Sequence, residues 1–114
     1  MKEFVLIFRL NNNTNSRPSP EQMQERMNWL ASIAAQNKLA DKGKTLPVSN
    51  AKTVRPSNVV TDGPYTEIKE FIVGFMIVKT ATIDEAVELA NSNPILKMGG
   101  TVEVREAVTL GENS

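Results

Sequence analysis

The sequence contains no cysteine and no histidine among its 114 residues. The lack of cysteine excludes disulfide bonds, thiolate zinc sites and a cysteine nucleophile. The lack of histidine removes the most common general base and the most common metal-binding side chain. Carboxylates are then the strong metal ligands that remain, and Asp84, Glu85 and Glu88 lie near a predicted helix start, where they favour the helix dipole. We therefore expect no metal and no cofactor.

Long apolar runs and an excess of charge of one sign are also missing. The N-terminal apolar run, residues 4–8, is too short for a signal peptide or a membrane span, so we expect a cytoplasmic protein with no membrane partner. The 13 basic residues balance the 13 acidic ones. Aromatic residues make up only 5% of the chain and are not interleaved with basic residues. Direct nucleic-acid binding is therefore not expected.

The charge is distributed unevenly along the chain. Residues 1–57 carry nine Lys or Arg and four Asp or Glu, whereas residues 58–114 carry four and nine. The opposite net charges of the two halves indicate that they fold against each other and compensate. The alternative interpretation is that the basic half forms an anion-binding surface. At this length, we expect one domain over residues 1–110, followed by a polar tail at 111–114.

The pattern of apolar and polar residues predicts three strands and two helices. The strands are expected at 4–8, 71–78 and 101–108, the first two apolar on both faces and the last alternating. One helix is predicted at about 19–37, because Ser19 and Gln22 form a capping box before an apolar stripe of Met23, Met27, Leu30, Ile33 and Ala34. The other is predicted from Thr82 and Glu85 up to Asn93-Pro94, with a stripe of Ile83, Ala86, Val87 and Ala90. Trp29 falls off the first stripe, which favours interface packing.

The segment between the first helix and the second long strand is predicted to be an extended hairpin region. Its two arms, residues 51–55 and 58–61, turn near Pro56-Ser57, and Asp62-Gly63 begins a further turn. Gly74 within the most apolar strand indicates a bulge or a close approach of another segment. The resulting order of elements predicts an α+β, ferredoxin-like sandwich: an antiparallel sheet with two helices on one face.

Two helices cover only one face of such a sheet. Residues 4–8 and 71–78 would then expose several large apolar side chains on the second face, because successive residues of a strand point to opposite sides. A contiguous apolar patch of that size usually marks an interface or a ligand groove. We therefore predict a homodimer with the sheets face to face and a small-molecule pocket between them.

The motif Asp62-Gly63-Pro64-Tyr65 resembles the YCII-related family, and within it the subgroup marked by Asp-Gly-Pro-Phe. The flanking segments 52–55 and 67–72 fit the same pattern, as do residues 94–100 before the last strand and Pro18-Ser19-Pro20-Glu21. The resemblance covers nearly the whole chain and implies a dimeric α+β barrel. It also implies a regulatory role, because members of this subgroup are often encoded beside, or fused to, extracytoplasmic-function sigma factors. The His–Asp pair proposed for related YCII proteins has no counterpart here, since histidine is absent.

Five residues are candidates for the site. Asp62 is a candidate general base or ligand anchor, with a turn-forming role as the alternative. Arg55 is a candidate anion clamp or a partner of Asp62. Tyr65 is a candidate hydrogen-bond donor or a packed corner residue. Arg9 and Arg105 either point into an inter-subunit cavity or pair with Glu103 or Glu106.

Three functional hypotheses follow from these residues. The first is a regulatory protein that binds a small organic ligand without turnover, with a sigma factor as partner. The second is a histidine-independent lyase, isomerase or cofactor-free oxygenase acting on a small organic acid, with Asp62 as the base. The third is a purely structural dimerising module, which predicts no sizeable cavity between the sheets.

Overall fold

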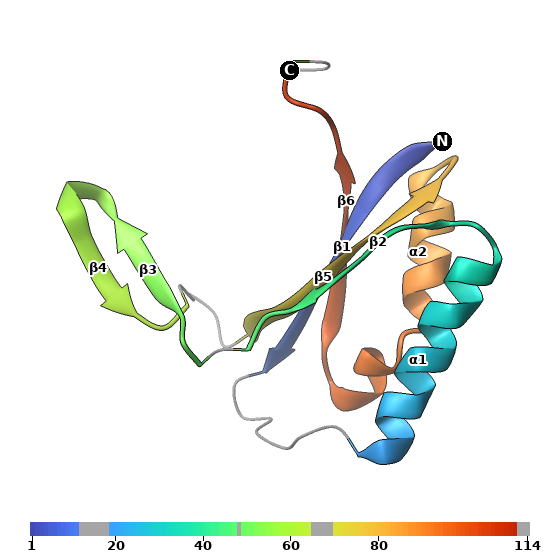
Figure 1. Cartoon of the computed structure of the whole chain (residues 1–114), viewed down its shortest axis with the longest axis horizontal. Helices are drawn as coiled ribbons and strands as arrows, with labels where there is room; N and C mark the ends of the chain where they lie inside the picture. Colours follow the sequence, from blue (N-terminus) through green and yellow to red (C-terminus); the bar gives the residue numbers. More distant parts are fainter. Residues whose placement is uncertain (12–18, 48, 65–69, 112–114) are drawn as a thin grey trace.

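A computed structural model describes residues 1–11, 19–47, 49–64 and 70–111. These residues form six strands, two α-helices and two short 3-10 helices (Figure 1). In chain order these are β1 Lys2–Asn11, α1 Pro20–Ala35, β2 Leu39–Thr45, β3 Lys52–Arg55, η1 Pro56–Asn58, β4 Val59–Asp62, β5 Glu70–Thr80, α2 Ile83–Asn91, η2 Pro94–Met98 and β6 Thr101–Ala107.

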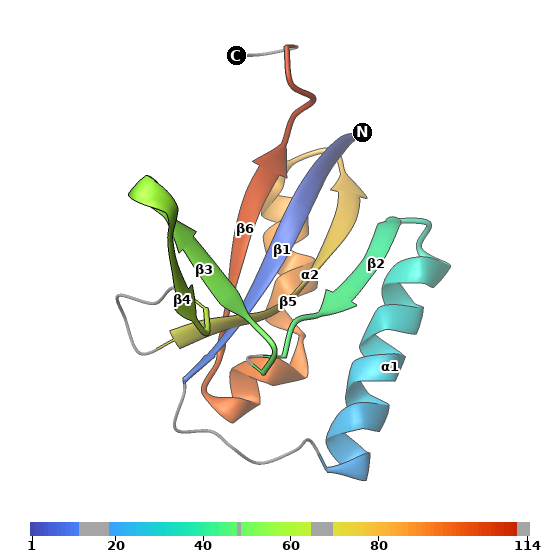
Figure 2. The ribbon, with the colours of Figure 1, turned by 60° about the vertical axis from the view of Figure 1, so that its left-hand side comes forward.

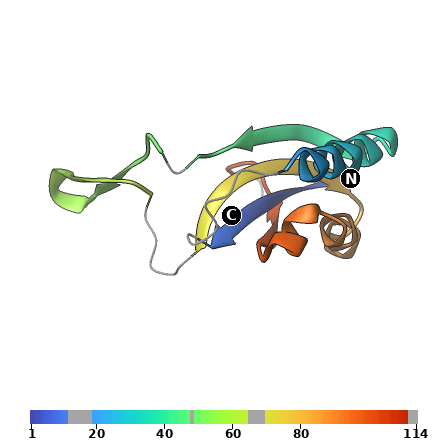
Figure 3. The same cartoon turned by 90° about the horizontal axis from the view of Figure 1, so that it is seen from below.

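Four strands form one antiparallel sheet in the order β2-β5-β1-β6. The helices α1 and α2 both lie on one side of this sheet (Figures 1 and 3). Central β1 pairs with β5 on one side and β6 on the other, as the two βαβ halves of a ferredoxin-like fold require. The predicted α+β, ferredoxin-like fold is confirmed.

The core lies between the sheet and the helices. Phe4 and Leu6 of β1 face Val78 and Met76 of β5 in the ladder, and all four side chains are buried. Trp29 is also buried, and its ring meets that of Phe8 edge-on at 6.2 Å between centroids. Its indole N–H donates to the backbone carbonyl of Leu89 in α2, at 2.8 Å. Trp29 is therefore a core residue that joins α1 to α2, and the expected interface role was wrong.

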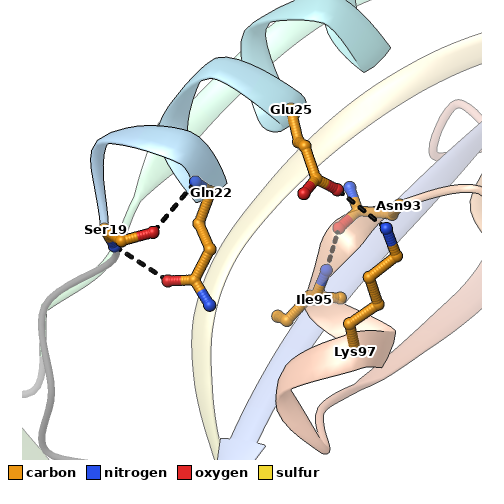
Figure 4. Close-up of polar contacts among 6 residues, drawn as sticks. All are labelled: Ser19, Gln22, Glu25, Asn93, Ile95 and Lys97. Carbon is orange, nitrogen blue, oxygen red and sulfur yellow. Dashed lines mark hydrogen bonds and ion pairs between the residues drawn. The ribbon is translucent and has the colours of Figure 1, made fainter.

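The predicted N-terminal caps are present and set the starts of both helices. The hydroxyl of Ser19 accepts the backbone N–H of Gln22 at 3.1 Å, and the Gln22 amide oxygen accepts the N–H of Ser19 at 2.8 Å (Figure 4). The hydroxyl of Thr82 accepts the N–H of Glu85 at 3.3 Å. These bonds satisfy backbone donors that a helix leaves unpaired at its first turn.

One contact joins η2 to α1, and another caps the start of η2. The Lys97 ammonium lies 2.9 Å from the Glu25 carboxylate of α1, and the buried Asn93 side chain accepts the N–H of Ile95 at 2.8 Å (Figure 4). The same segment ends the second helix, as Asn93-Pro94 predicted. The two expected stripes were only partly correct. Four of their apolar side chains are at least 40% exposed: Met23, Met27, Ile83 and Val87.

The fourth strand of the sheet is β2, which was predicted only as part of an extended hairpin region. Its sequence, Leu39–Thr45, carries three charged residues and one glycine, which is typical of an edge strand protected against further pairing. The Asp41 carboxylate accepts the N–H of Gly43 at 2.7 Å, beside register shifts in the β2–β5 ladder. Gly74 of β5 lies next to a bulge opposite β1 and close to the backbone of Lys44, so both features predicted for it are present.

The second face of the sheet is apolar at its centre. By the alternation along β1 and β5, it presents Val5 and Ile7 beside Ile77 and Phe75, their ladder partners, and all four are half-buried. Among the described residues, both helices lie on the other side (Figure 3). We call this surface the open face. Neither described helix is long and apolar enough to cross a membrane.

Candidate ligand-binding site on the open face

Two arginines and one glutamate meet on the open face. The Arg9 guanidinium of β1 donates a hydrogen bond to Glu103 of β6 and forms an ion pair with it. The Arg105 Nε lies 3.7 Å from the other oxygen of the same carboxylate. The cluster carries two positive charges against one negative charge, so it attracts anions.

Strand register explains why these residues meet. Glu103 lies opposite Ile7 and Arg105 lies opposite Val5 in the β1–β6 ladder. Arg9 is two residues beyond Ile7, so all three charged side chains point to the same face as the apolar pairs. Of the two alternatives considered for Arg9 and Arg105, the structure shows the pairing with Glu103. Their position in an inter-subunit cavity stays a prediction.

The local electrostatics are dominated by Arg9. Its hydrogen bond lowers the pKa of Glu103 below the ordinary value of 4.5, and the charges of Arg9 and Arg105 act in the same direction, against a smaller opposing effect of burial. The Arg9 side chain is 26% exposed, whereas that of Arg105 is 70% exposed. Arg9 is thus held in place, while Arg105 has most of its surface available to a ligand or partner.

The lowered pKa gives a pH-dependent stability. Because Glu103 is more acidic in the folded chain than in the unfolded one, its contribution is fully present above pH 4.5 and is lost as the pH falls through the folded-state pKa. The free energies of unfolding in urea of wild type and Glu103→Gln should therefore differ at pH 7, and the difference should shrink as the pH falls below 4.5. A stability difference that stays constant across this range would contradict the ion pair.

The other predicted site residues lie on the β3–β4 hairpin. Asp62 is at the end of β4, where its carboxylate is 2.6 Å from the Lys52 ammonium and its side chain is 91% exposed. Arg55 ends β3 opposite Val59, at the far end of the hairpin from Asp62. Tyr65 lies outside the described residues. Within one chain, Arg9 and Arg105 are thus brought together, and Arg55 and Asp62 are separated.

Lys52 is the partner of Asp62 that sequence reasoning missed. The hairpin turns through η1, and paired residues lie equally far from Ser57. Counting from that centre places Lys52, rather than Arg55, opposite Asp62. The predicted turn at Pro56-Ser57 was therefore sufficient to predict the Lys52–Asp62 pair, had the strand register been counted from it.

A hollow open to solvent lies beside α1 and the residues before η2, lined by Glu25, Asn28, Trp29, Ser32, Ser92 and Pro94. None of the predicted site residues lines it. Among the residues that the structure describes, no three acidic side chains gather where they would hold a metal ion.

Comparison with known proteins identifies the family. Residues 4–110 match the YCII-related domain. An uncharacterised protein of Rhizobium meliloti (strain 1021) is 38% identical over 85 residues, a match that covers 63% of this chain and 66% of the relative. The chain thus spans just under two thirds of that relative's length. Because the domain match extends over nearly all of the sequence, from β1 through β6, the chain belongs to the YCII-related family.

Proposed function

We propose that two copies of the chain associate through their open faces, as a dimeric α+β barrel, and bind a small organic anion between the sheets. The observation that carries this proposal is the Arg9–Glu103–Arg105 cluster beside an uncovered apolar surface. A binding site of this type needs apolar walls and a few convergent polar groups. The open face supplies both.

The apolar half of the open face supports the dimer. Val5, Ile7, Phe75 and Ile77 are each half-buried in the single chain. A large apolar side chain gains about 1.5–3 kcal/mol on going from full exposure to full burial, and these partly buried residues gain a fraction of that each. A symmetric dimer covers the set twice, so the total gain favours association. A second copy covers the face without requiring any further element of the chain.

The charged half of the open face supports an anionic ligand. An arginine guanidinium binds a carboxylate through two parallel hydrogen bonds and keeps its charge at every physiological pH. Glu103 occupies part of this donor capacity in the ligand-free chain. An incoming carboxylate therefore competes with Glu103 for the arginines.

This competition predicts opposite effects for two substitutions. Arg9→Gln should weaken binding of a small carboxylate about ten- to hundredfold, because a charge-assisted hydrogen bond contributes about 1.5–3 kcal/mol. Glu103→Gln should strengthen binding severalfold, because it frees the two guanidinium groups. Calorimetric titration with benzoate and succinate measures both effects, and Arg26→Gln on the exposed surface of α1 is the matched control. The absence of carboxylate binding, or a weakening by Glu103→Gln, would contradict the anion site.

We further propose that ligand binding gives the protein a regulatory role. It rests on the resemblance to the Asp-Gly-Pro-Phe subgroup, whose members are often encoded with sigma factors. The alternative, a histidine-independent lyase, isomerase or oxygenase with Asp62 as base, needs that carboxylate in an enclosed site. Within one chain Asp62 faces solvent beside Lys52, so the ligand-binding hypothesis has the stronger support.

A further inference from the structure

The β3–β4 hairpin forms a sheet of its own. Its two strands pair with each other and not with the four-stranded sheet. The hairpin extends from the end of that sheet on the side away from α1 and α2, as Figures 1 and 3 both show, and Figure 2 shows it beside the strands rather than the helices. This is the side on which the open face lies.

One face of the hairpin is apolar and exposed. Val54 and Val60 are opposite each other in the ladder and are 76% and 55% exposed. The Lys52–Asp62 ion pair lies on the same face, two residues away on each strand. An isolated two-stranded hairpin is marginally stable in water, so a surface that packs on the valine pair would stabilise it.

The area of the open face gives a second argument. Stable interfaces bury about 800 Å² and about 20–30 residues on each partner. Only alternate residues of a strand point to one face, so the four-stranded sheet offers roughly 17 positions. The sheet alone therefore falls somewhat short of a typical stable interface, and the hairpin is the described element on the same side that enlarges it.

We propose that the β3–β4 hairpin is an arm that packs its Val54–Val60 face against a second copy of the chain, at the rim of that copy's open face. The inference rests on the proposed open-face dimer and extends it. By the two-fold symmetry, each subunit gives one arm and receives one. Each anion site is then closed by a hairpin from the other subunit, and Asp62, which shares the Val54–Val60 face, acts across the interface rather than within its own chain.

The test compares dimer dissociation constants measured by sedimentation. Val54→Lys combined with Val60→Lys should raise the dissociation constant at least tenfold, because it places charges in a buried apolar contact. Val59→Lys is the matched control, since Val59 lies on the opposite face of the same hairpin, and it should change the constant less than threefold. Should the lysines unfold the hairpin, Val54→Thr with Val60→Thr keeps the strand-favouring shape and should give a smaller increase of the same sign.

The outcomes separate this inference from the proposed function. If the hairpin variants dimerise like wild type while Ile77→Lys on the open face dissociates, the hairpin does not contact the second copy. The proposed open-face dimer is then still supported. If Val59→Lys weakens the dimer as much as the Val54 and Val60 pair, the assigned hairpin face is wrong. A wild-type chain that is monomeric at all concentrations overturns both proposals.

Discussion

Gly43→Ala is expected to remove β2 from the sheet and to cost about 3 kcal/mol of unfolding free energy. Gly43 has φ +72°, and a Cβ atom added there would lie 1.6 Å from the Phe75 carbonyl oxygen. The obstacle is backbone, so no side-chain rotation relieves it, and the edge strand must move away from β5. At roughly 4 °C per kcal/mol, the melting temperature should fall by about 12 °C.

Gly99→Ala separates the steric clash from the backbone strain. Gly99 also has a positive φ, +82°, but an added Cβ would meet nothing within 4 Å. This control should therefore cost only about 1 kcal/mol, the usual penalty for a side chain in the left-handed region. Equal melting temperatures for the two variants would show that β2 does not pack against Phe75 as the structure describes.

Ile77→Lys is expected to dissociate the dimer while leaving the monomer folded. Ile77 is at the centre of the open face, with Val5 and Asp41 as its ladder partners. In the dimer the two-fold axis duplicates each new ammonium, so two charges must be desolvated. At about 2 kcal/mol each, a modest figure for a charge in an interface, the dissociation constant should rise about 1000-fold.

The dissociated Ile77→Lys chain is expected to stay folded, because Asp41, the ladder partner of residue 77, offers a carboxylate near the new ammonium group. The far-ultraviolet circular dichroism spectrum should therefore match that of wild type. Val87→Lys is the matched control, because Val87 lies on α2 in the helical layer and is 40% exposed. If Val87→Lys dissociates the dimer and Ile77→Lys does not, the subunits meet through the helices rather than the sheets.

The strands and helix starts could be predicted from sequence because local chemistry specifies them. Ser19 and Thr82 stand where side-chain oxygens cap the first helical turns. The run from Phe71 to Val78 is β-branched and aromatic, and it forms the central part of β5. Gly74 also has the predicted close approach of another segment. In each case the signal lies within a few residues of the feature.

The features that were missed depend on distant contacts. Strand β2 is polar, and only its pairing with β5 makes it a strand. Trp29 is buried because α2 supplies the Leu89 carbonyl, 60 residues away. Met23 and Met27 follow helical spacing but remain exposed. Periodicity identifies a possible apolar stripe, whereas the packing of the other helix decides which residues of α1 are covered.

In the candidate site, too, local sequence predicted some features and distant contacts determined the others. Alternation along β6 placed Glu103 and Arg105 on one side, and the end of β1 placed Arg9 near them. Which of these groups pair depends on the β1–β6 register, which the sequence does not specify. Arg55 was predicted as a possible partner of Asp62, whereas the structure places these two residues at opposite ends of a separate two-stranded sheet.

The most direct test of the account is the mass of the chain in solution, measured by light scattering across a range of concentrations. The open face predicts a particle of twice 12.6 kDa at micromolar concentration, which returns to a single chain in Ile77→Lys. A wild-type mass of 12.6 kDa at every concentration, with a folded spectrum, would contradict the account, because the open face would then be stable in water without a partner.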